Sequence, residues 1–306
     1  LCTYCNPIDK NVSGKEIQLL NFIKENYYDQ IIENCRSIIK PLELDIYLPE
    51  LNLAFEFNGL YWHNEINKPN NYHKDKSDMC QEKRIQLIHV WEDDWMYKQD
   101  IVKSMILNKL GKTPNKIMSR KCEVKEIGYQ ETKQFLETNH INGFINSKIK
   151  IGLFYQGELI SIMCFKEYKN QFNLIRFCDK LNTQVIDSSK VLFNYFINNY
   201  NPQEVFSYVD RSYYQNCYAE MGFKIIEKIN PDYSYVFDGI RLHKINFRKE
   251  LLVQEGYDPL KSEHDIMLER GIFRIYDSGK IKFKYIKRKE CSSELHSLTD
   301  PKVSGH

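Results

Sequence analysis

The stretch LELDIYLPELNLAFEFNGLYWH, residues 42–63, decides the fold that the first part of the chain is expected to adopt. It contains two short runs in which apolar and polar residues alternate, and a Pro-Glu turn signal separates them. Because successive side chains point to opposite faces of a strand, Glu56 and Asn58 are expected on one face and their apolar neighbours on the other. The stretch therefore predicts a pair of adjacent strands that carries carboxylates.

Two carboxylates of this strand pair, Asp45 and Glu56, form the first candidate site. Burying a carboxylate costs several kcal/mol or more unless the group is paired or holds a metal. Hard cations such as magnesium prefer oxygen ligands, at roughly 2.0–2.1 Å. The two side chains are therefore expected to share one divalent cation. The alternative is a half-exposed hairpin whose polar face meets water.

The same residues carry a resemblance to a known group of enzymes. An Asp followed after about ten residues by E-x-N-G-x-x-W-H resembles the very-short-patch-repair endonucleases. It is closer still to the phage-type homing endonucleases of the EDxHD group, within the PD-(D/E)xK nuclease superfamily. The resemblance implies a metal-dependent endonuclease that hydrolyses DNA phosphodiester bonds at a specific site. It also implies that Asp45, Glu56 and the backbone carbonyl near Phe57 hold Mg²⁺ or Mn²⁺.

The resemblance gives further residues catalytic roles. Glu16 either reaches the metal through water or caps the first helix, and Asn58 stands where the superfamily usually has a lysine. That departure shifts acid–base work onto His63, because imidazole titrates near neutral pH. Lys74 is the substitute for this role and His73 flanks the same edge, although both also suit a solvated helix start.

Contacts to double-stranded DNA are assigned to two places. Tyr61 and Trp62 are expected to insert into the base stack, which costs a few kcal/mol. Lys280, Lys282 and Lys284 alternate with apolar residues, so all three are expected on one side of a strand that contacts phosphates. The alternative is that these lysines protect an exposed strand edge. The net charge of +2 is low for a nucleic-acid-binding chain.

A second resemblance covers residues 124–230. The hairpin IGLFYQGELISIMCF, a strand–helix unit and a late N-x-Y-x-x-x-G-F motif resemble the Gcn5-related (GNAT) acetyltransferases. That family binds the pyrophosphate of acyl-CoA with a Q/R-x-x-G-x-G/A loop. The matching stretch here runs from Gln184 to Ser189, with Asp187 in place of the first glycine. Since a carboxylate repels phosphate, the domain is interpreted as a scaffold that binds no acetyl-CoA.

The expected fold class is α/β (α+β), with a restriction-endonuclease-like three-layer core, a mixed-sheet acetyltransferase-like domain and a small C-terminal module. A helix His73–Arg84, a strand Ile85–Trp91 and one long helix Glu92–Leu110 are expected in the core. In the last module, Ile272–Tyr276 and Lys280–Tyr285 are expected to pair as a hairpin. The predicted units are 1–12 (a truncated zinc ribbon), 13–112 (nuclease), 117–245 (acetyltransferase-like), 246–290 (helix–hairpin module) and 291–306 (a disordered tail).

Composition narrows the remaining possibilities. The 306 residues contain nine scattered cysteines, an odd number that fits reduced thiols in a cytosolic protein. The homing-endonuclease resemblance implies that the protein is phage-encoded and acts in a bacterial host. Cys2 and Cys5 are expected to hold structural Zn²⁺ only with further ligands upstream, and two incidental thiols are the alternative. No apolar run is long enough to span a membrane. Two rival functions stay open: an acyltransferase or DNA-modifying enzyme acting through the second domain, and a catalytically silent DNA-binding protein.

Overall fold

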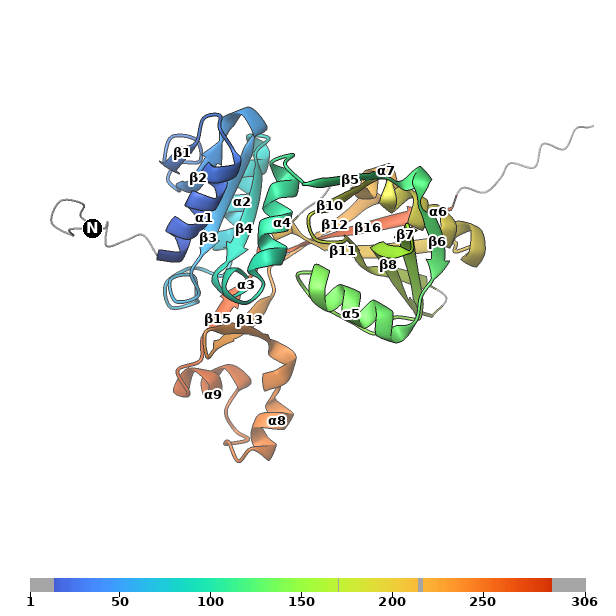
Figure 1. The fold of residues 1–306 in the computed structure, drawn as a ribbon. Helices are drawn as coiled ribbons and strands as arrows, with labels where there is room; N and C mark the ends of the chain where they lie inside the picture. Colours follow the sequence, from blue (N-terminus) through green and yellow to red (C-terminus); the bar gives the residue numbers. More distant parts are fainter. Residues whose placement is uncertain (1–13, 170, 214–216, 288–306) are drawn as a thin grey trace, which may run out of the picture.

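The computed structural model describes residues 14–169, 171–213 and 217–287, which form three parts (Figure 1). The predicted zinc-ribbon cysteines Cys2 and Cys5 and the predicted tail 291–306 lie outside these residues. None of the helices in the described part of the chain is long and apolar enough to cross a membrane.

The first part, called here the N-terminal domain, covers residues 14–110. Its strands pair in the order β1-β2-β3-β4; β2 and β3 are antiparallel, as the sequence predicted, and β3 and β4 are parallel. The elements are α1 (Gly14–Asn26), β1 (Ile32–Cys35), β2 (Leu44–Leu48), η1 (Pro49–Leu51), β3 (Leu53–Asn58), α2 (Tyr72–Glu82), β4 (Gln86–Trp91), α3 (Glu92–Tyr97) and α4 (Gln99–Lys109).

Helices cover both faces of this sheet. Phe55 and Phe57 of β3 pack in one core with α1 and α4, whereas Ala54 packs in a second core with Cys80 of α2. The predicted alternation along β3 is therefore confirmed. The prediction of a single long helix over residues 92–110 is wrong. The backbone leaves the helical conformation at Lys98 (φ −133°, ψ 35°), so two shorter helices form.

The second part, the acetyltransferase-like domain, contains residues 115–229 and 280–286. Its main sheet has the order β12-β16-β11-β9-β8-β7-β6, and β5 and β10 form a separate parallel pair. Helix α5 covers one face, and α6 and α7 cover the other. The elements are β5 (Asn115–Met118), η2 (Ser119–Lys121), β6 (Glu123–Glu126), α5 (Tyr129–Asn139), β7 (Ile149–Tyr155), β8 (Glu158–Tyr168), β9 (Gln171–Asp179), β10 (Thr183–Ile186), α6 (Ser188–Tyr200), β11 (Glu204–Asp210), η3 (Arg211–Tyr213), α7 (Cys217–Glu220), β12 (Lys224–Ile229) and β16 (Lys280–Ile286).

The two parallel strands β9 and β11 separate part-way along their length. They pair from Phe172 to Leu174 on β9 and from Val205 to Ser207 on β11. Immediately afterwards, the pairing of β9 with β8 shifts register between Leu174 and Arg176, which leaves Ile175 as an extra residue. Such a bulge bends a strand and increases its twist. The bulge thus explains why the two strands diverge beyond this point.

The third part, the C-terminal module, covers residues 233–276 and lies below the N-terminal domain in Figure 1. Its strand order is β14-β13-β15. The prediction that residues 272–276 and 280–285 pair as a hairpin is wrong. Strand β15 pairs with β13, whereas β16 lies between β11 and β12 in the main sheet of the acetyltransferase-like domain. The elements are β13 (Tyr233–Phe237), β14 (Ile240–His243), η4 (Lys244–Phe247), α8 (Lys249–Gln254), α9 (Glu263–Glu269) and β15 (Arg274–Tyr276).

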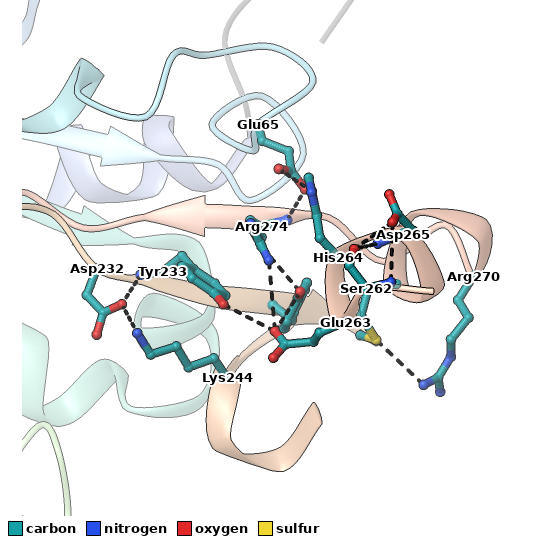
Figure 2. Close-up of polar contacts among 12 residues, drawn as sticks. Glu65, Asp232, Tyr233, Lys244, Ser262, Glu263, His264, Asp265, Arg270 and Arg274 are labelled. Atoms are coloured by element: carbon teal, nitrogen blue, oxygen red, sulfur yellow. Dashed lines mark hydrogen bonds and ion pairs between the residues drawn. The ribbon is translucent and has the colours of Figure 1, made fainter. Parts of the chain in front are cut away.

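Polar contacts connect this module to the N-terminal domain (Figure 2). Glu65 accepts hydrogen bonds from His264 Nε2 and from the backbone N–H of Arg274, both at 2.8 Å. Inside the module, Glu263 accepts a hydrogen bond from the hydroxyl of Tyr233 at 3.2 Å. The loop after β3 is therefore fixed against β15 rather than left free.

A buried charge cluster makes a second connection. Arg241 of β14 donates to both oxygens of Asp93 at 2.8 and 3.0 Å and to Asp94 at 2.6 Å. Its guanidinium also lies 4.4 Å from the ring centre of Trp91, within cation–π range. The hydroxyl of Tyr213, from the acetyltransferase-like domain, donates to Asp94 at 3.2 Å. All three parts of the molecule therefore meet at this cluster.

Candidate functional site

The carboxylate pair predicted from the sequence does come together on β2 and β3, but a lysine joins it. Lys76 of α2 forms a buried ion pair with Glu56, which is 2% exposed. Asp45 Oδ2 accepts a hydrogen bond from the backbone N–H of Phe57 at 2.7 Å. Burial raises the pKa of Glu56 to about 8, and the charge of Asp45 adds to the rise. Lys76 therefore supplies the positive charge that the sequence prediction assigned to a metal ion.

This arrangement corrects the predicted metal site. Within the described residues, no group of three or more His, Cys, Asp or Glu side chains is placed to hold a metal ion. Phe57 contributes its N–H to Asp45, and one oxygen of Glu56 is occupied by Lys76. The prediction of a Mg²⁺ or Mn²⁺ cofactor is therefore wrong, whereas catalytic roles for Asp45 and Glu56 stay predictions.

Histidines surround the same cluster. His63 Nδ1 lies 2.8 Å from His73 Nε2, as the sequence prediction of a shared edge requires. Burial lowers the pKa of His63 to about 2 and that of His73 to about 3, so both imidazoles are uncharged at neutral pH. His89, which the sequence reasoning missed, connects Asn58 (3.1 Å) to Ser77 (2.9 Å). Its signal was a histidine inside the apolar run 85–91.

The other predicted residues of this domain are accessible or partly accessible. Tyr61 is 66% exposed and Trp62 is 65% exposed, and their rings meet edge to face at 5.0 Å. Lys74 forms an ion pair with Asp78 at 3.1 Å, and Glu16 lies in the first turn of α1. A DNA-contacting or catalytic role for these side chains stays a prediction.

The three lysines of β16 do share one face of a strand, but that strand is not at an edge. Lys282 lies 3.8 Å from Glu227, and Lys284 forms an ion pair with Glu204 at 2.7 Å. Because β16 lies between β11 and β12, the edge-protection alternative is wrong. Phosphate contacts by Lys280, Lys282 and Lys284 stay a prediction.

A second candidate site opens where β9 and β11 separate. A cavity of about 800 Å³ begins between the strands and reaches the N-terminal domain and the C-terminal module. Beyond residues 174 and 207 the facing edges of β9 and β11 no longer pair with each other. Both strands, α7 and the residue after α5 contribute to the walls of this cavity: Leu174, Ser207, Cys217, Tyr218 and His140.

A hydroxyl pair marks the point at which the strands part. Ser207 Oγ lies 2.9 Å from the carbonyl oxygen of Leu174 and 3.2 Å from the hydroxyl of Tyr218. A carbonyl only accepts, so the single serine proton goes to Leu174, and the phenol is then free to donate to Ser207. Burial raises the pKa of Tyr218 to about 12, against a lowering effect of Ser207. At neutral pH this side chain is a protonated donor.

Two other groups of the cavity are uncharged. Burial raises the pKa of Cys217 to about 12, so its thiol is not ionised and is a poor nucleophile at neutral pH. Burial, together with Arg176 and Lys98, lowers the pKa of His140 to about 3. Its Nδ1 accepts from the backbone N–H of Asn142 at 3.1 Å, which leaves the proton on Nε2.

The N-terminus of α6 lies in the loop that the sequence reasoning compared with a phosphate-binding loop. Asp187 precedes the helix in the left-handed conformation (φ 62°, ψ 15°) and makes no capping hydrogen bond. Lys190 lies 3.1 Å from Asp187 and 3.5 Å from Glu220 of α7. Two carboxylates and one lysine therefore surround this helix terminus.

Comparison with known proteins gives the fold of the second part. No family model matches the sequence, and no curated protein sequence matches it. Among solved structures, the chain is similar to a Bacillus subtilis acetyltransferase in complex with CoA (9% identity, 55% of this chain, 99% of that chain, TM-score 0.33). It is also similar to an IAA acetyltransferase from Bacillus cereus (10%, 54% and 99%, 0.32) and to a GNAT family acetyltransferase from Elizabethkingia anophelis with acetyl-CoA bound (10%, 55% and 99%, 0.33).

The predicted acetyltransferase-like domain is therefore confirmed at the level of fold, over about half of the chain. At these identities and TM-scores, neither a substrate nor a mechanism follows for this protein. What the fold and the cavity define is a mixed α/β chain with a GNAT-like domain whose central parallel strands diverge around a cavity.

The main functional prediction needs correction as well. The matched structures are acetyltransferases, enzymes of acyl transfer, whereas the sequence predicted hydrolysis of DNA phosphodiester bonds. Nothing among them supports a restriction-endonuclease-like core. The prediction of a metal-dependent DNA endonuclease is therefore wrong, because Lys76 pairs with the carboxylate and no metal-ligating group is found among the described residues.

Proposed function

We propose that the acetyltransferase-like domain transfers an acyl group from a thioester bound between β9 and β11. One observation supports the proposal. The two parallel strands stop pairing after Leu174 and Ser207, and the protonated phenol of Tyr218 lies where they separate. The function is one of the two alternatives that the sequence left open.

The divergent strands offer a binding surface for an extended arm. On its other side, β9 still pairs with β8, and β11 still pairs with β16, so each strand stays rigid while one edge faces the cavity. An unpaired strand edge presents backbone N–H and C=O groups that can bond to amides of an added segment. An amide-bearing arm of a thioester fits this surface.

In this proposal Tyr218 acts as the general acid. The acceptor's nucleophile adds to the thioester carbonyl carbon, the C–S bond breaks, and the departing sulfur carries the electron pair. The phenol of Tyr218 donates its proton to that sulfur, while the acceptor's proton passes to water. Ser207 can then rotate its hydroxyl to donate to the phenolate. General acid help of this kind typically contributes about 10²–10⁴-fold in rate.

Direct transfer suits the site better than a covalent intermediate on Cys217. That thiol lines the same cavity, but its raised pKa leaves it protonated at neutral pH. The thiolate is the nucleophilic form of cysteine, so an acyl-cysteine step is disfavoured here.

Hydrogen exchange tests the binding surface directly. S-acetylpantetheine should slow backbone amide exchange in residues 175–179 and 208–210, because its amides would pair with both free edges. Strand β7, which is paired on both sides, gives the internal control and should be unaffected. Unchanged exchange in both segments at saturating ligand would contradict the proposal.

A further inference from the structure

The fold family implies coenzyme A as the acyl donor, and the N-terminus of α6 provides the test of whether that group fits. A helix N-terminus attracts phosphate because its first N–H groups have no partner within the helix. A polyphosphate bound there needs free donors and no nearby negative charge. The charges around α6 do not meet the second requirement.

Internal hydrogen bonds fix part of the loop before α6. Asp179 accepts from the backbone N–H of Val185 at 2.9 Å and from the hydroxyl of Ser188 at 3.0 Å. The preceding residues 183–186 form β10, which pairs along its whole length with β5. The N–H of Val185 and the hydroxyl of Ser188 are therefore not available to an anion.

The charges around the N-terminus of α6 also disfavour a bound polyphosphate. Asp187 is exposed at the N-cap, and Glu220 faces the same lysine from α7. With Lys190 shared between them, the three side chains sum to one negative charge. The pyrophosphate of coenzyme A would meet this charge, so coenzyme A does not fit the site. Asp187 itself has a left-handed backbone conformation that glycine adopts easily.

We propose that the donor is an acyl thioester on a pantetheine-type arm without the nucleotide diphosphate of coenzyme A. This rests on the proposed function, because it uses the same cavity and the same strand edges. Two sources share this chemistry: an acylated carrier protein, whose arm has a single phosphodiester, and a small free thioester. The carboxylates at α6 select against the polyphosphate of coenzyme A rather than against the arm.

Binding of three probes to the full chain tests this inference: S-acetylpantetheine, acetyl-CoA and an acetylated carrier protein. Calorimetry should give at least a tenfold weaker affinity for acetyl-CoA than for S-acetylpantetheine. Asp187→Asn combined with Glu220→Gln should tighten acetyl-CoA at least tenfold and leave S-acetylpantetheine within twofold. Glu131→Gln, an exposed change on α5, is the matched control and should alter neither affinity.

The outcomes separate the two proposals. Equal or tighter binding of acetyl-CoA to the wild type would overturn the inference about the donor and leave acyl transfer standing. Binding of none of the three probes would overturn both proposals. If the carrier protein binds more tightly than S-acetylpantetheine, the donor is carrier-bound; equal affinities identify the small thioester.

Discussion

Ser207 Oγ lies 3.2 Å from the hydroxyl of Tyr218 and 2.9 Å from the carbonyl oxygen of Leu174. This relationship joins α7 to both parallel strands at the residues where their pairing ends. The bulge at Ile175 makes the opening, and the hydroxyl pair puts a proton donor at its apex. Fold geometry and proposed chemistry therefore depend on the same few residues.

Ser207→Ala should slow acyl transfer about tenfold to a hundredfold. A hydrogen bond to a charged group contributes about 1.5–3 kcal/mol, and the variant removes the donor that stabilises the Tyr218 phenolate. Ser161→Ala is the matched control, because Ser161 also donates to a backbone carbonyl (Cys178, 3.3 Å) but lies on β8. Equal rates for the two variants would show that Ser207 has no role beyond packing.

Arg241→Met should lower the free energy of unfolding by about 3–5 kcal/mol, since it leaves Asp93 and Asp94 buried without their partner. Adding Asp93→Asn and Asp94→Asn to this variant should recover much of the loss, because the uncompensated charges are removed. Urea denaturation of the single and triple variants measures the difference. A triple variant that is less stable than Arg241→Met would contradict this account of the cluster.

Lys76→Met should destabilise the N-terminal domain more at pH 8 than at pH 5. The pKa of Glu56 is raised by burial and by Asp45 from 4.5 to about 8, so the folded state binds its proton more tightly than the unfolded state. Stability therefore falls as pH rises between these values, and loss of the compensating lysine raises the pKa of Glu56 further, so that the fall continues to higher pH. Thermal unfolding across this range tests the slope. Glu56→Gln in the Lys76→Met background should flatten it.

Asp277→Asn should remove a pH dependence of stability between about pH 4 and pH 6. Burial, with a contribution from Asp210, raises the pKa of Asp277 from 3.8 to about 6. The folded state thus holds the proton more tightly, and wild-type stability falls as pH rises through this window. One pKa unit corresponds to about 1.4 kcal/mol, so the variant should be more stable at pH 7 by about 1–3 kcal/mol. Its amide oxygen can still accept from the N–H of Gly279. A wild-type profile that is flat from pH 4 to pH 6 would contradict the assignment.

The sequence predicted strands and turns well where neighbouring residues alone determine them. The alternation over residues 53–58 predicted β3 and its two faces, and Gln156-Gly157 predicted the turn between β7 and β8. The pairing partner of β16 was not predictable in this way. Its lysine alternation is the same in a hairpin and in the interior of a sheet, and long-range contacts with β11 and β12 decide between them.

The candidate site was partly visible in the sequence. Asp45, Glu56, His63 and His73 do gather, as the resemblance implied. Lys76 was expected beside the same edge but was not counted among the site residues, because a lysine at a helix start is usually solvated. The motif N-x-Y-x-x-x-G-F was used as a sign of fold, although it contained Tyr218. The hydroxyl pair with Ser207 could not be foreseen, since it depends on where β9 and β11 stop pairing.

Turnover of S-acetylpantetheine by the wild type and by Tyr218→Phe is the most direct test of acyl transfer in the cavity. Release of free thiol in the presence of an amine mixture should exceed the uncatalysed rate, and Tyr218→Phe should reduce it about 10²–10⁴-fold. Tyr168→Phe, at a side chain that is 69% exposed on β8, should leave the rate unchanged. Thiol release by Tyr218→Phe at the wild-type rate, or none above background from the wild type, would contradict the account.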